Sequence, residues 1–111
     1  MRVSNNNAID KVDNLEEFQG SNTFGKWVSY DEGRTRLFVV YSYGHHFPMY
    51  VYDDNENTWV GNKDKYSRST TRHQSLLRPS KGVEVWLDTE ELKSLVSNRG
   101  IVGYTINKAQ N

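Results

Sequence analysis

Basic side chains crowd the middle third of the chain, and their chemistry is that of phosphate binding. Residues 61–81 have a local charge of +5, whereas residues 1–60 sum to −4 and residues 82–111 to −1. The cations of this segment are Lys63, Lys65, Arg68, Arg72, Arg78 and Lys81. With Tyr66 among them and Trp59 nearby, the segment combines phosphate-binding and base-stacking groups, and we include His73 in it. It predicts a nucleic-acid surface, and the alternative is a solvated face that balances the acidic remainder.

A cluster of hydroxyl side chains lies inside the same basic segment. Ser69, Thr70 and Thr71 stand between Arg68 and Arg72, where a helix is expected to begin. Free amides at a helix start attract anions, so these three residues predict a phosphate or sulfate site. The alternative is that the hydroxyls only cap the helix, each contributing about 1 kcal/mol.

Metal and catalytic patterns are weak in this sequence. His45 and His46 are adjacent, so in an extended segment their side chains point in opposite directions and make poor joint ligands. There is no G-x-S-x-G elbow, glycine-rich phosphate loop or H-E-x-x-H pair. The carboxylates of Asp53, Asp54 and Glu56 belong to a predicted turn, where solvation keeps them ionised. We therefore predict a protein that is not an enzyme and uses no metal and no cofactor.

Length and composition predict one domain. The chain has 111 residues, no cysteine and a net charge of zero, which excludes disulfides and thiolate chemistry. It has no apolar run long enough for a membrane span, and its first residues lack a signal peptide's apolar stretch, so we expect a cytoplasmic protein without membrane contact. Residues 1–23 form a polar segment, either partly disordered or a short helix from Ile9 to Phe18. Residues 24–111 form the domain.

Alternating apolar residues predict most of the strands of this domain. A meander is expected from four strands at Lys26–Tyr30, Thr35–Tyr43, Phe47–Tyr52 and Thr58–Val60, followed by further strands at Val83–Leu87 and Ile101–Ile106. Period-two alternation puts Tyr41 and Tyr43 on one face of their strand, and Tyr50 and Tyr52 on one face of theirs.

Two short helices complete the expected fold. Thr71 and Gln74 have the spacing of a capping box, so a helix is predicted to begin there and to end before Pro79. Asp88 and Glu91 form a second box ahead of a helix that ends at residues 98–100. The predicted architecture is α+β, with a mainly antiparallel sheet and both helices on one face.

One segment of the chain resembles a known group of proteins. The resemblance covers residues 37–79 and is carried by Tyr41-Ser42-Tyr43-Gly44, Pro48, Trp59, Asn62, Lys65-Tyr66-Ser67, Thr70-Thr71 and Arg72-His73-Gln74-Ser75. The same order resembles that of small uncharacterised phage and plasmid proteins. Ser69 and the pair His45-His46 depart from the pattern. The resemblance implies an accessory protein of a mobile element and indicates origin more than activity.

Three functions remain open at this point. The first is a non-enzymatic accessory protein that binds nucleic acid through residues 63–81. The second is an inhibitor that binds a host or defence enzyme, with the acidic residues of 10–17 and 53–56 imitating DNA phosphates. The third is a metal hydrolase built on His45, His46 and His73. An exposed edge strand at Lys26–Tyr30 or Ile101–Ile106 could also pair two copies into a homodimer.

Overall fold

Six strands form one sheet in the order in which they occur along the chain. The computed structural model describes residues 8–20, 22–30, 35–43, 47–65 and 67–97. The strands are β1 (Phe18–Gln19), β2 (Thr23–Tyr30), β3 (Thr35–Ser42), β4 (Pro48–Asp53), β5 (Thr58–Asn62) and β6 (Val85–Leu87). Neighbours from β1 to β5 pair antiparallel, and β6 pairs parallel with β5. The predicted α+β class with a mainly antiparallel meander is confirmed.

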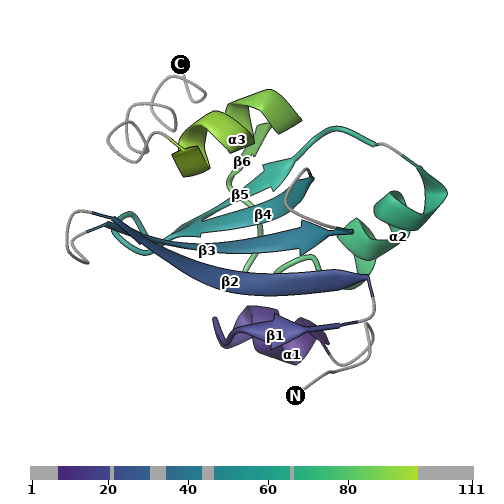
Figure 1. The fold of residues 1–111 in the computed structure, drawn as a ribbon, viewed down its shortest axis with the longest axis horizontal. Coiled ribbons are helices and arrows are strands. Elements are labelled where there is room, and N and C mark those ends of the chain that lie inside the picture. The colour runs from purple at the N-terminus through teal and green to yellow at the C-terminus, as the bar shows by residue number, and fades with distance from the viewer. Residues whose placement is uncertain (1–7, 21, 31–34, 44–46, 66, 98–111) are drawn as a thin grey trace.

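The described residues form three helices, and they are distributed over both faces of the sheet. They are α1 (Ala8–Asp13), α2 (Arg68–Leu76) and α3 (Thr89–Ser97). In Figure 1, α1 and α3 lie on opposite sides of the sheet, and α2 stands beyond the end of β3. The expectation that both predicted helices share one face is wrong, because Leu76 of α2 packs against the cluster that contains Val12, whereas Leu92 and Leu95 of α3 belong to the cluster on the other face. Its physical reason is that strands β3 to β5 are apolar on both sides, so each face needs its own cover. None of these helices is long and apolar enough to cross a membrane.

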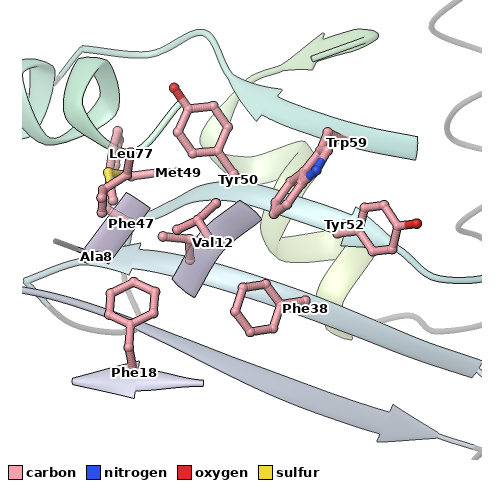
Figure 2. Close-up of a cluster of buried hydrophobic side chains, with 11 residues drawn as sticks. Ala8, Val12, Phe18, Phe38, Phe47, Met49, Tyr50, Tyr52, Trp59 and Leu77 are labelled. Atoms are coloured by element: carbon pink, nitrogen blue, oxygen red, sulfur yellow. The ribbon is translucent and has the colours of Figure 1, made fainter. Parts of the chain in front are cut away.

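One face of the sheet builds an aromatic core against α1. Val12 lies in the middle of this group in Figure 2, which gathers side chains from α1, β1, β3, β4 and β5. The cluster contains Ala8, Val12, Phe18, Phe38, Val40, Phe47, Met49, Tyr50, Tyr52, Trp59 and Leu77. Register explains the composition, because Phe38, Tyr52 and Trp59 stand opposite one another on adjacent strands.

The other face is covered by α3 and is mostly aliphatic. Val39, Val51 and Val60 are paired across three strands, and Leu92 and Leu95 of α3 lie in the same cluster. Tyr41 also belongs to this face, where its ring stacks on Phe24 with 4.8 Å between centroids.

The predicted pairing of Tyr41 and Tyr43 on one face is wrong. Tyr43 lies beyond the end of β3, and its φ of 65° ends the alternation of the strand. Its side chain is 60% exposed, whereas Tyr41 is buried. Tyr50 and Tyr52 do share a face, as predicted, and both lie in the aromatic core.

Most predicted elements correspond to observed ones within a few residues. Helix α1 is shorter than the predicted Ile9–Phe18 helix, because the chain turns at Leu15, whose φ is 56°. Helix α2 begins at Arg68 and not at Thr71. The predicted capping box of α3 is confirmed, since the Asp88 and Glu91 side chains each accept the other's backbone N–H, at 2.8 and 3.0 Å. The predicted strand Ile101–Ile106 and the predicted helix end at residues 98–100 lie outside the described residues.

The edge formed by β2 is partly covered in this structure. β1 pairs with Phe24 and Gly25, and the Glu17 carboxylate accepts the backbone N–H of Trp27 at 2.8 Å. Less of this edge is therefore open to a second copy of the chain than the sequence suggested.

Gly25 provides a test of how tightly the aromatic core is packed. A Cβ atom at Gly25 would lie 2.5 Å from the Phe18 ring and 2.9 Å from the Phe38 ring. We expect Gly25→Ala to lower the free energy of unfolding by about 1–3 kcal/mol through overpacking, measured by chemical denaturation. Ser29→Ala, at an exposed position of the same strand, serves as the control and should change it by less than about 0.5 kcal/mol. Equal stability of both variants would contradict the tight packing around Gly25.

Candidate nucleic-acid interface

Helix α2 begins at a serine cap inside the basic segment. Ser67 has extended backbone angles, and its Oγ accepts the backbone N–H of Thr70 at 3.1 Å. Its carbonyl accepts the N–H of Thr71 at 2.9 Å, as the first hydrogen bond of the helix. The spacing of Ser67 and Thr70 was the relevant signal, while the pair Thr71 and Gln74 lies within the helix.

The exposed face of α2 carries cations at helical spacing. Arg68, Thr71, Arg72 and Ser75 occupy positions i, i+3, i+4 and i+7, which share one face. Together with Lys65 and Ser67 they line an open hollow of about 480 Å³. We call this the α2 hollow. Three of the six predicted cations, Lys65, Arg68 and Arg72, are thus brought together at one place.

Among the residues that the structure describes, no carboxylate forms an ion pair with a cation of the α2 hollow. Within the described part of the chain the ion pairs are Lys11–Glu16 and Arg36–Asp54, both elsewhere on the surface. Lys65 donates only to the uncharged Oε1 of Gln74, at 3.4 Å. The hollow therefore keeps its positive charge.

A buried set of hydrogen bonds fixes the inner face of α2. Nε2 of Gln74 donates to the carbonyl oxygens of Asn62 at 2.9 Å and of Asp64 at 3.2 Å. Nδ2 of Asn62 donates to the Pro48 carbonyl at 2.8 Å and to Oγ1 of Thr89 at 3.0 Å. A backbone hydrogen bond from Thr89 lowers the pKa of Asp64, which therefore stays ionised. These contacts hold the loop that carries Lys65 against the helix.

The remaining predicted cations are placed outside the α2 hollow. Arg78 lies over the Trp86 ring, with its Cζ 5.4 Å from the centroid. Lys81 lies over Tyr52, in a separate hollow beside Asp13. Lys63 is exposed and its N–H donates to the Leu87 carbonyl at the end of β6. The basic segment thus divides into one cluster of three and three dispersed cations.

His73 is placed inside the protein. It is 5% exposed, its Nδ1 shares a 2.8 Å hydrogen bond with Oγ of Ser42, and the Tyr43 ring lies 5.3 Å from its own. Burial, with a smaller contribution from the charge of Arg72, lowers its pKa. His73 is therefore neutral near pH 7 and anchors α2 to the end of β3.

The predicted anion site is only partly assembled. Thr70 is buried, and the backbone N–H groups of Thr70 and Thr71 already bind Ser67. Thr71 lines the α2 hollow, whereas Ser69 is exposed without lining it. The hydroxyls of Ser67 and Thr70 bond each other at 3.1 Å, as expected of a cap.

The structure gives less support to nucleophilic catalysis and to metal binding. Ser42 is buried beside His73, so the pair is closed to substrate. Within the described ranges no group of three or more His, Cys, Asp and Glu side chains could hold a metal. His45, His46 and Tyr66 lie outside the described residues.

The acidic side chains proposed to imitate DNA are largely engaged within the chain. Asp13 accepts both the N–H and the hydroxyl of Ser80, at 2.9 and 2.6 Å. Asp53 is buried, which raises its pKa, and it accepts the N–H groups of the following turn. Asp54 is 3.9 Å from Arg36. Asp13, Asp53 and Asp54 thus each have a partner within the chain, whereas Asp10 and Glu56 are exposed.

Two aromatic residues that the sequence did not assign to a site are exposed in the structure. Among the described residues, Tyr43 at 60% and Trp86 at 38% are the exposed large hydrophobic side chains. Side chains alternate between the two faces of a strand, so with Val85 and Leu87 buried on one face of β6, Trp86 is expected on the other face. No local pattern indicates the left-handed backbone of Tyr43.

The fold and the site together define an α+β protein with a basic, unpaired helix face. Comparison of the chain with protein-family models, with curated proteins and with solved structures found no match. The geometry of the α2 hollow is therefore the basis for the proposed function.

The position of His73 predicts a pH dependence of stability. Because burial holds its pKa below the ordinary 6.5, the folded protein binds the proton less readily than the unfolded chain. Stability contributed by the neutral ring is present above pH 6.5 and is lost as the pH falls from 6.5 to the lowered pKa. We expect an NMR titration to give His73 a pKa below 6.5, and His73→Gln to flatten the decline in unfolding free energy between about pH 7 and pH 5.5.

The His73→Gln spectrum assigns the resonance, and the other two histidines serve as internal references. An ordinary pKa for His73 would contradict its burial against Ser42.

Proposed function

We propose that this protein binds nucleic acid through the α2 hollow and acts as a non-enzymatic accessory protein of a phage or mobile element. The observation that carries the proposal is the convergence of Lys65, Arg68 and Arg72 on one open hollow, where no carboxylate of the described ranges is paired with them. Phosphate groups are the ligands that such a cluster binds by counterion release.

The placement of cations on α2 supports this proposal because it does not stabilise the helix. Arg68 occupies the first turn, where the helix dipole disfavours positive charge, and that turn has no acidic residue. Arg68 and Arg72 are also four residues apart, so the two like charges repel each other by a few tenths of a kcal/mol. Helix α3 has the stabilising arrangement, with Glu90 and Glu91 in its first turn. Binding of a polyanionic ligand explains why α2 has positive charge in its first turn.

A binding role is better supported than catalysis. The buried Ser42–His73 pair is the nearest approach to a nucleophile and base among the described residues, and no carboxylate orients the ring. The α2 hollow contains cations and hydroxyls but no carboxylate or imidazole for general acid-base catalysis.

The salt dependence of binding tests the proposal. We expect the double variant Lys65→Ala, Arg72→Ala to bind a labelled oligonucleotide more weakly. The slope of log affinity against log salt concentration should become shallower by about 0.7–0.9 for each phosphate that the variant no longer neutralises. Fluorescence anisotropy over a range of NaCl concentrations measures both effects.

A charge-matched control separates the site from net charge. Lys26→Ala, Lys93→Ala removes two cations from β2 and α3, away from the α2 hollow, and should leave the slope close to that of the parent. Equal slopes for parent and both variants would refute the proposal. A pull-down from host lysate whose partner survives nuclease treatment would favour the protein-binding alternative.

A further inference from the structure

Of the two exposed aromatic residues, Tyr43 contacts α2 directly and Trp86 is linked to it through Tyr50. The ring of Tyr43 lies 5.3 Å from that of His73, on the side of the helix that faces the end of β3. Tyr50 connects Trp86 to α2. The Tyr50 hydroxyl donates to the Gln74 carbonyl at 2.6 Å, and the Tyr50 ring centroid lies 6.4 Å from that of the indole. One exposed ring therefore contacts the helix that carries the cationic face, and the second is separated from it by one residue.

Trp86 is held in place so that part of its ring remains open. A Cβ atom at Gly61 would lie 2.6 Å from the indole, which shows how closely the ring is seated on the β5 backbone. Arg78 lies over the ring, with its Cζ 5.4 Å from the centroid, and a guanidinium group is itself a surface on which bases stack. The edge strand therefore presents a supported indole and a cation together.

The backbone and the exposure of Tyr43 both disfavour an aromatic residue at this position. Its φ of 65° falls in the left-handed region, where Gly and Asn are accommodated at lower cost than an aromatic residue. Exposure of 60% also removes most of the benefit of burying the ring. An aromatic side chain at this position is useful as a surface that contacts a ligand.

We propose that the surface around α2 binds single-stranded nucleic acid, with phosphates on Lys65, Arg68 and Arg72 and unpaired bases stacked on Tyr43 and on the Arg78–Trp86 pair. This inference rests on the proposed function and narrows its ligand. Single strands are bound by a positively charged groove combined with aromatic stacking platforms. Bases within a duplex are already stacked on each other, so a duplex would use the cations alone.

Binding of three matched ligands tests this inference. They are a labelled DNA strand without self-complementarity, the same strand annealed to its complement, and an RNA strand of the same sequence. We expect the parent protein to bind a single strand more tightly than the duplex. Tyr43→Asn and Trp86→Leu should each lower single-strand affinity at least about five-fold and leave duplex affinity unchanged.

The variants are chosen to remain folded. Asn suits the left-handed backbone of residue 43, and Leu at residue 86 keeps an apolar side chain over Gly61. Trp27→Phe on β2 is the aromatic control and should not change binding, because Trp27 is half-buried and bonded to the Leu15 carbonyl. Thermal melts check that all variants are folded at the temperature of the assay.

Each outcome has a separate meaning. If the DNA strand or the RNA strand binds more tightly than the duplex, the inference is supported. The strand with the higher affinity then shows whether the ligand is DNA or RNA. Equal affinity for strand and duplex, with no effect of Tyr43→Asn or Trp86→Leu, overturns the inference but leaves the proposed function standing if Lys65→Ala, Arg72→Ala still weakens binding. No binding to any of the three ligands overturns both.

Discussion

The buried side-chain amide of Gln74 is the contact on which the candidate site depends. Its two N–H donors bind the carbonyls of Asn62 and Asp64, and its oxygen accepts from Lys65. A buried amide left without partners costs about 1–3 kcal/mol, so this arrangement fixes both the helix and the loop before it. Asn62 extends the constraint to Pro48 and to Thr89 at the start of α3. The exposed cations of α2 are positioned because its inner face is locked.

Many of the described residues in the motif between Tyr41 and Ser75 are part of this internal framework. Ser42 and His73 bond each other, Asn62 and Gln74 join β5 to α2, and Ser67 caps the helix. Trp59 lies in the aromatic core. Of the cations in the pattern, Lys65 and Arg72 reach the α2 hollow. These residues are therefore explained largely by the need to hold α2 in one position, and only partly by the surface that the helix presents.

The strands could be predicted from the sequence because their cause is local. Alternating apolar residues and turn formers define β2 to β5, and the Asp88 and Glu91 pair defines the start of α3. The distribution of the helices over two faces could not be predicted, because it depends on which residues of β3 to β5 oppose one another across the sheet. For the site, charge counting identified Lys65, Arg68 and Arg72 but not their separation from Lys81 and Arg78. That separation follows from the end of α2 at Leu76, after which the chain crosses the aromatic face of the sheet.

Two local arrangements at α2 depart from what stability alone would select. One is positive charge in the first turn of a helix, and the other is an exposed tyrosine with a left-handed backbone. Leu15 also has a left-handed backbone, but its side chain packs against the aromatic core, and α3 has a reciprocal capping box. Sequences generally agree with their folds at every level except where function imposes another requirement. Because Arg68 and Tyr43 come from different elements and border the same helix, one shared requirement explains both more simply than two unrelated defects. A ligand with phosphates and exposed bases meets that requirement.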